Sequence, residues 1–144
     1  MLPIVLAPDP RLRTMSRPVR DDEFGADLDF VMDQMILTLQ NERGAGLAGV
    51  QVGDTRCIIL VCLGPNKVPE KMVNPKLIKT SNVRASAEEG CLSFPGRTIQ
   101  KSRPRQVTVE YNTPFGEVKS VTLTGFEARC VQHEIDHLGG KTIL

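Results

Sequence analysis

Apolar residues recur at three- and four-residue steps along the segment that follows residue 20. The spaced positions are Phe24, Leu28, Val31, Met32, Met35, Ile36 and Leu39. This spacing predicts an amphipathic helix over Glu23–Asn41 that packs by one face, with Asp21 or Asp22 as its N-cap. The preceding 20 residues predict an extended arm, because prolines at positions 3, 8, 10 and 18 exclude a regular helix there.

The middle of the chain has the patterns of β-strands. The predicted strands span residues 56–63, 71–79, 82–88, 106–111 and 118–123. The first is almost continuously apolar, which is typical of a buried strand. The last two alternate between apolar and polar positions and flank a turn-rich segment, as in a hairpin. Breaks in the strands 71–79 and 82–88 are expected at Pro75 and at Ser81–Asn82.

The C-terminal part predicts a second helix. Thr124 and Glu127 have the spacing of a capping box at its start, and the helix should run to about Leu138, where Gly139 or Gly140 stops it. The order of elements predicts an α+β fold, in which antiparallel-rich mixed β-sheets fold around this C-terminal helix and one long helix lies near the N-terminus. A length of 144 residues suits a single domain, 1–144.

Composition narrows the function classes. Lys and Arg total 18 against 17 Asp and Glu, so a protein whose affinity comes from phosphate contacts with nucleic acid is not expected. No apolar run approaches the roughly 20 residues of a membrane span, and the proline-containing N-terminus lacks the pattern of a signal peptide. The four cysteines are therefore expected to be reduced thiols.

The predicted C-terminal helix carries the chain's only two histidines, His133 and His137. They lie one turn apart on one helix face, so both imidazoles can reach one ion. Glu134 lies one step round the helix and can reach a water bound to that ion. This is the HExxH arrangement of metal hydrolases. The alternative, a surface helix with two solvated histidines, is less favoured, since the chain has no other histidine.

Two imidazoles leave such a site one ligand short, because a catalytic zinc-like site has three protein ligands and a position for water. The segment 138–144 contains no Glu, Asp or His, so the third ligand must come from upstream. Cys130 would lie about 10 Å from His137 along the helix, and we interpret it as a small core residue. Cys91 follows Glu89 and a glycine and is the best candidate.

Cys57 and Cys62 fall in the predicted apolar strand. Five positions apart, they point to opposite faces of a regular strand. We interpret both as buried small hydrophobic residues rather than as ligands.

Three segments of the chain stand together, namely Gly44-Ala-Gly-Leu-Ala-Gly-Val-Gln51, Glu89-Gly-Cys-Leu-Ser93 and Gln132-His-Glu-Ile-Asp-His-Leu138. In this order they resemble the peptide deformylase family. The likeness extends to the segment 8–13 and to the long first helix, so it covers nearly the whole chain. The departures are Gly49 in place of a second alanine, Ala45 in place of a branched residue, and Gly139 in place of a frequent asparagine. The chain stops at Leu144 without the long C-terminal helix of many members; short forms occur, including phage-encoded ones, so we do not expect a fragment.

The resemblance implies a metal-dependent hydrolase that removes the N-formyl group from the N-terminal methionine of newly made polypeptides and releases formate. One divalent metal ion is implied, with Fe(II) expected and Zn(II), Ni(II) or Co(II) as substitutes. The implied site residues are Cys91, His133 and His137 as metal ligands, Glu134 as general base and acid, and the Gln51 side chain and the Leu92 N–H group as oxyanion donors.

An apolar pocket for the methionine side chain is expected from Ala45, Phe126, Cys130 and residues near Glu89. The substrate backbone is expected to pair as an added strand with Gly46 on one side and Gly90 on the other. Arg97 and Arg103 either orient acidic residues, contact the peptide or are solvated surface charges.

The implied partners are formyl-Met nascent peptides and the ribosome near its exit tunnel, with no direct binding to nucleic acid or membrane. We expect a monomer in the bacterial cytoplasm, or in the host cytoplasm if the chain is phage-encoded. Two alternatives stay open. An HExxH-type metallopeptidase should carry a downstream ligand. A binding module with a structural Cys-His-His zinc site should supply a fourth Cys or His.

Overall fold

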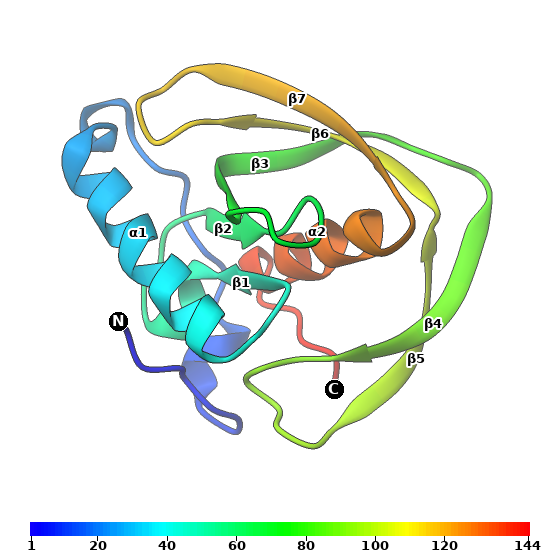
Figure 1. Ribbon diagram of the computed structural model, residues 1–144. Coiled ribbons are helices and arrows are strands. Elements are labelled where there is room, and N and C mark those ends of the chain that lie inside the picture. Colours follow the sequence, from blue (N-terminus) through cyan, green and yellow to red (C-terminus); the bar gives the residue numbers. More distant parts are fainter.

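Two antiparallel sheets and two helices make up the computed structural model, which describes residues 1–144 and confirms the predicted α+β class (Figure 1). The five-stranded sheet has the order β1-β2-β3-β6-β7, and β4 and β5 form a separate two-stranded sheet. The strands are β1 (Gly46–Ala48), β2 (Ile58–Val61), β3 (Glu70–Thr80), β4 (Arg84–Gly90), β5 (Thr98–Pro104), β6 (Gln106–Asn112) and β7 (Val118–Thr124). The predicted hairpin is confirmed as β6–β7.

Strand β2 divides the core into two layers. Its four residues are all buried, and they alternate between two groups of apolar side chains. Ile58 and Leu60 pack with α1 (Ala26–Asn41), whereas Ile59 and Val61 pack with α2 (Gly125–Leu138). The two helices therefore cover opposite faces of this part of the sheet. In Figure 1, α2 lies inside the arc that the two sheets form together.

The N-terminal arm is extended, as predicted, apart from short 3₁₀ turns at Pro10–Arg13 and Asp21–Glu23. Its backbone is tied to the rest of the fold, since the N–H of Val5 donates to Gln51 O (2.7 Å) and the N–H of Ala7 donates to Ser93 O (2.9 Å). The arm thus connects the 3₁₀ turn that contains Gln51 with the loop that contains Ser93.

The predicted N-cap of the first helix is wrong, whereas Thr124 is confirmed as the N-cap residue of α2 and Gly139 as its C-cap. The first helix begins at Ala26 instead of Glu23, with Gly25 at the N-cap, because Asp21–Glu23 form a separate turn and the Glu23 carboxylate binds Arg17 (2.7 Å). At α2, the side chain of Thr124 makes no capping hydrogen bond. Thr124 is at the same time the last residue of β7, where it pairs with β6.

Pro75 does not break its strand. β3 runs through it, because the register against β6 shifts between Val73 and Lys76 and this irregularity accommodates the proline. Asn74, at a φ of 49°, exchanges two hydrogen bonds with the backbone of Val19 (2.8 and 3.1 Å). Strands β1 and β5 were not predicted, and β4 extends to Gly90.

Neither helix combines the length and the apolar character that crossing a membrane requires.

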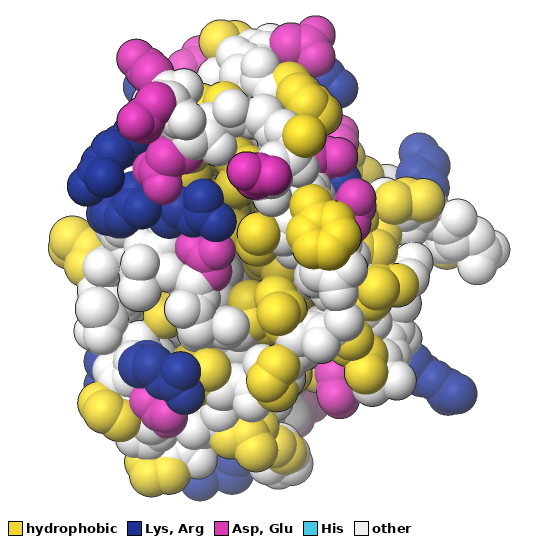
Figure 2. Space-filling view, turned by 90° about the vertical axis from the view of Figure 1, so that its left-hand side faces the viewer, with side chains coloured by type: hydrophobic (Ala, Val, Ile, Leu, Met, Phe, Trp, Pro, Cys, Tyr) yellow, Lys and Arg dark blue, Asp and Glu magenta, His cyan; other side chains and the backbone are white.

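Figure 2 shows the face at the left of Figure 1, where apolar side chains lie among charged groups of both signs, in keeping with a net charge of +1. No histidine shows on this face, and both histidines are buried.

Candidate active site

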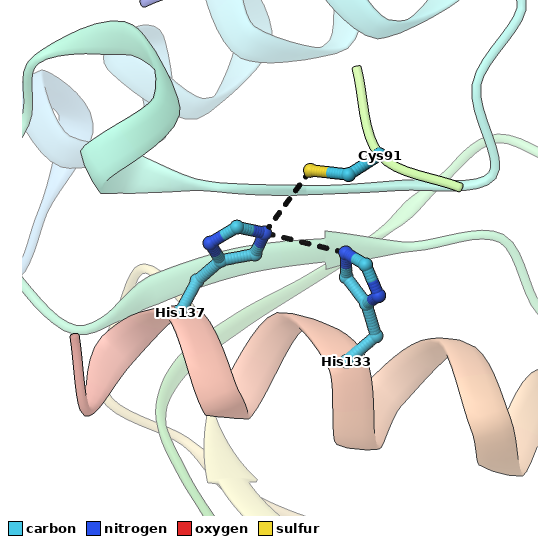
Figure 3. A group of neighbouring side chains, drawn as sticks. All are labelled: Cys91, His133 and His137. Carbon is cyan, nitrogen blue, oxygen red and sulfur yellow. Dashed lines mark hydrogen bonds between the residues drawn. The ribbon is translucent and has the colours of Figure 1, made fainter. Parts of the chain in front are cut away.

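Cys91, His133 and His137 meet between the end of β4 and helix α2. Both imidazoles rise from the same face of α2 towards Cys91, which follows the last residue of β4 (Figure 3). His137 Nε2 lies 3.3 Å from His133 Nε2 and 3.4 Å from Cys91 Sγ. The structure therefore brings together the three residues that the sequence singled out, one from a strand end and two from a helix.

The donor atoms fit one divalent ion. One atom from each residue lies within 4.8 Å of the other two. Ligand atoms about 2.1–2.3 Å from one ion in tetrahedral geometry are separated by roughly 3.4–3.8 Å, and the spacings of 3.3 and 3.4 Å around His137 agree with this. Imidazole nitrogen and thiolate sulfur suit zinc and iron alike. No further His, Cys, Asp or Glu joins the group, so a fourth position is left for water or substrate.

Glu134 is buried beside this cluster. The residue is 4% exposed, and its Oε1 atom has no hydrogen-bond partner. Burial raises the pKa of Glu134 to about 7. The carboxyl therefore ionises near neutral pH, which suits a group that takes up and releases a proton.

Gln51 points its amide nitrogen at the cluster. It belongs to the 3₁₀ turn Gly49–Val52, and its Oε1 accepts a hydrogen bond from the N–H of Ala48 (3.0 Å). This contact fixes the orientation of the amide, so Nε2 donates to Ser93 Oγ (3.1 Å) and lies 3.4 Å from Cys91 Sγ. The predicted second donor, the N–H of Leu92, makes no hydrogen bond within the protein.

Glu89 borders the pocket, near which it was predicted to lie. Its carboxylate is engaged in four hydrogen bonds. Oε1 accepts from Arg103 (2.9 Å) and faces His133 Nδ1 at 3.1 Å, while Oε2 accepts from Arg103 (2.6 Å) and Arg129 (2.6 Å). Burial would raise the pKa of Glu89, but these partners hold it well below its usual range. Glu89 therefore orients the His133 ring.

The two imidazoles differ in charge when no ion is bound. Burial lowers the pKa of His133, but hydrogen bonds to Cys91 and Glu89 outweigh it and raise that pKa to about 10. Burial, together with the charges on His133 and Arg103, lowers the pKa of His137 to about 3. His137 is accordingly neutral at pH 7 and has a free lone pair for an ion.

Of the two arginines with open roles, Arg103 is buried and Arg97 is exposed at the pocket rim. Arg103 binds Glu89 and also Asp136 (2.9 Å), so of the three alternatives its contacts favour the one in which it orients acidic residues. Arg129 was missed by the sequence reasoning. The available signal was its position one turn before His133 on the same face of the helix.

A cavity of about 1020 Å³ opens onto Cys91, His133 and Glu134. Its walls include the predicted pocket residues, namely Ala45, Gly46, Gly90, Phe126 and Cys130. The N-terminal arm adds Pro3, Ile4 and Leu6, which were not predicted. Phe126 is 64% exposed, so its ring lies at the mouth and not deep in the pocket.

There is little room for a side chain where β1 passes the cluster. A Cβ atom at Gly46 would lie 2.7 Å from both Cys130 Sγ and Glu134 Oε2. A Cβ at Gly49, the position that departs from the family pattern, would lie 2.8 Å from Ile58 Cγ1. The close packing of β2 thus accounts for a glycine there.

The remaining cysteines lie outside the cluster, and all four are free thiols, as predicted. Cys57 packs against the α2 layer and Cys62 against the α1 layer, which matches the prediction of opposite faces, although both are half-buried. Cys130 is buried in the core as predicted.

An HExxH helix whose histidines meet a cysteine, with a buried glutamate beside them and a groove in front, defines a metal-dependent hydrolase. The sequence profile of the family described as "Polypeptide deformylase" matches residues 1–144. The chain belongs to this family.

Its relatives match nearly the whole of this chain. The peptide deformylase of Rhizobium meliloti (strain 1021) is 38% identical over 141 residues, which is 96% of this chain and 80% of that protein. The class I type b peptide deformylase from Acinetobacter baumannii has a TM-score of 0.94 at 35% identity, covering 99% of this chain and 97% of that chain. A second structure of that enzyme, with Met-Ala-Ser bound, has a TM-score of 0.92 at 32% identity, covering 99% and 96%.

The activity follows from this membership. The enzyme is a metal-dependent hydrolase that removes the formyl group from the N-terminal methionine of newly made polypeptides and releases formate. The two alternatives do not fit, since the cluster includes neither a ligand downstream of His137 nor a fourth Cys or His.

Proposed function

We propose that Cys91, His133 and His137 hold one Fe(II) ion for this reaction, with Zn(II), Ni(II) or Co(II) as substitutes. The observation that carries the proposal is the approach of the three donor atoms to within 4.8 Å of one another at the end of the cavity. When bound, such an ion supplies a Lewis acid that acidifies water and polarises the formyl oxygen.

Glu134 transfers a proton from the attacking water to the leaving amine. Its carboxylate accepts a proton from the water that attacks the formyl carbon, and it returns this proton to the amide nitrogen as the C–N bond breaks. The products are formate and a free amine, so water supplies every added atom. A pKa near 7 supports both halves of this role, because neither protonation state is strongly disfavoured at neutral pH.

Gln51 and Leu92 stabilise the oxygen that becomes negative. The Gln51 amide is already oriented by Ala48 and Ser93, and the Leu92 N–H has no competing acceptor. Donors that need no rearrangement are the effective ones, and losing one typically costs about 10²–10³ in rate.

The substrate lies as an extended strand between β1 and β4. β1 pairs only with β2, and β4 pairs only with β5, so each keeps one free edge. Gly46 and Gly90 on these strands both border the cavity. The methionine side chain then contacts Ala45, Cys130 and the ring of Phe126 at the mouth of the cavity. The narrow space beside Gly46 excludes an acetyl methyl group.

All of these groups come from residues 1–144, which we propose act as one catalytic domain and as a monomer. The substrates are formyl-Met nascent chains near the ribosomal exit tunnel, in the bacterial cytoplasm or that of a phage host. A net charge of +1 gives no basis for direct binding to nucleic acid.

Cys91→Ala tests the ligand set. We expect it to lose bound metal and formate release from a formyl-Met peptide, because two imidazoles alone bind an ion weakly. Cys62→Ala, another half-buried cysteine, is the matched control and should keep both. Metal content is read by elemental analysis of the purified proteins. Equal metal in Cys91→Ala and the unchanged enzyme would contradict the assignment.

A further inference from the structure

Arg129 joins α2 to both strands of the smaller sheet. Its side chain is 11% exposed, and its guanidinium donates to Glu89 Oε2 (2.6 Å), to Lys101 O (2.8 Å) and to Ala85 O (2.7 Å). Ala85 and Glu89 belong to β4, whereas Lys101 belongs to β5. One side chain of the helix thus holds three points on the two-stranded sheet.

The place of this sheet on α2 decides where Cys91 lies. β4 ends at Gly90 and the chain continues directly into Cys91, while both histidines belong to α2. The smaller sheet has no strand pairing with the larger one. Side-chain contacts between this sheet and α2 therefore contribute to the distance between the Cys91 sulfur and the imidazoles.

Arg129 belongs to an ion-pair network in this interface. Two arginines, Arg103 and Arg129, face two acids, Glu89 and Asp136, and Glu89 also faces the ring of His133. Arg103 already binds both acids, but its contacts do not include the backbone of β4. Only Arg129 bonds a side-chain carboxylate and main-chain carbonyls of both strands.

We propose that Arg129 is a positioning residue for the metal cluster. By holding β4 against α2, it sets the Cys91 sulfur at ligand spacing from the two imidazoles before an ion arrives, and through Glu89 it steadies the His133 ring. The inference rests on the proposed ligand set. A lysine would keep the charge but cannot present the planar fork that reaches three acceptors.

The test uses the whole chain with Arg129→Met, which keeps much of the apolar stem, and with Arg129→Lys. Co(II) is titrated into each metal-free protein against a competing chelator, well below the unfolding midpoint, and the absorption bands of the Co(II) form are recorded. We expect Arg129→Met to bind Co(II) about 10–100-fold more weakly, with shifted bands, and Arg129→Lys to recover part of the loss. Arg105→Met is the matched control, because Arg105 is exposed and its side chain makes no hydrogen bond or ion pair.

The outcomes separate the inference from the function beneath it. A lower melting temperature in Arg129→Met with unchanged Co(II) affinity and bands would show a structural role only and would overturn the proposal. Should Arg129→Met not fold, Arg129→Lys decides, and affinity and bands equal to those of the unchanged protein overturn it equally. Cys91→Ala is titrated in parallel. If Cys91→Ala binds Co(II) normally, the ligand set itself is wrong; if only Cys91→Ala fails to bind, the positioning role alone is wrong.

Discussion

At the scale of single residues, Glu134 shows how catalysis and stability oppose each other. The folded protein keeps its carboxyl buried with Oε1 unpartnered, and burial raises its pKa from 4.5 to about 7. The unfolded chain ionises at the lower value. Between these two pH values the unfolded state has lost a proton that the folded state retains, so folding becomes less favourable as the pH rises. Above about pH 7 the full penalty applies.

Glu134→Gln should therefore separate activity from stability. Turnover should fall by about 10²–10⁴-fold, because the proton carrier is gone, while bound metal is retained. Glutamine does not ionise, so the metal-free variant should be more stable than the metal-free unchanged protein at pH 8, on the order of 3 kcal/mol, and the gain should shrink towards pH 5. Urea unfolding at both pH values measures this.

The control is Glu117→Gln, because Glu117 is an exposed acid in the turn between β6 and β7 and lies outside the cavity. It should show no comparable gain at pH 8. If Glu134→Gln is no more stable at pH 8 than its parent, burial does not govern this carboxyl. If it deformylates at the parental rate, Glu134 is not the proton carrier.

At the scale of secondary-structure elements, the hairpin β6–β7 and the core of both helices could be predicted, because their apolar positions repeat with the period of the element. β5 could not, since Thr98–Pro104 contains few apolar residues and buries the charged Arg103. The first N-cap was missed because Asp21 belongs to a separate 3₁₀ turn, and the capping box of α2 is incomplete because the Thr124 side chain makes no capping hydrogen bond. The two histidines followed from spacing within one helix, and Cys91 followed from the lack of a ligand downstream of His137. Arg129 and the contacts of Glu89 depend on how that helix meets a sheet, which the sequence does not show.

The C-terminal end of α2 offers an element-scale prediction. Gly140 has a φ of 75°, and a Cβ there would lie 2.7 Å from the backbone oxygen of Arg13. Gly140→Ala should lower the free energy of unfolding by at least about 1–2 kcal/mol, because an L side chain is strained at this φ and the backbone cannot easily yield.

Gly139→Ala is the matched control. Gly139 has a φ of −89°, and its added Cβ would make only an ordinary contact with Asp136 O at 3.5 Å. Chemical denaturation of both variants in the metal-loaded form measures the difference. Equal stability of the two would mean that the close approach of the helix end to the N-terminal arm is not tight.

At the scale of the whole molecule, the two sheets and the N-terminal arm enclose a cavity of about 1020 Å³ that leads from solvent to the cluster. The same opening that admits a peptide also admits dissolved oxygen. Cys91 is half-buried at its inner end, so it is protected from bulk water but not from small molecules that enter the cavity.

This access predicts how the choice of metal affects the lifetime of the enzyme. Metal-free protein loaded anaerobically with Fe(II), Ni(II) or Zn(II) should be fastest with Fe(II), similar with Ni(II) and slower with Zn(II). In air the Fe(II) form should lose activity first, because oxygen oxidises iron and the oxidants formed attack the adjacent thiolate.

Activity is followed by formate release over time in air, with anaerobic samples of each metal form as controls. Mass spectrometry of Cys91 should show added oxygen in the aged Fe(II) sample. The prediction fails if the Zn(II) form is the fastest or if the Fe(II) form lasts as long in air as the Ni(II) form.

The free edges of β1 and β4 also set a limit in time. Both edges border one cavity, and in the proposed binding mode a substrate must offer unpaired backbone groups to both. A protein end that has already entered a helix or a sheet has those groups bonded elsewhere. Such an end can no longer enter. The enzyme must therefore reach each nascent chain during the interval between the emergence of its first residues and their folding, and a protein whose N-terminus folds early leaves it the shortest opportunity.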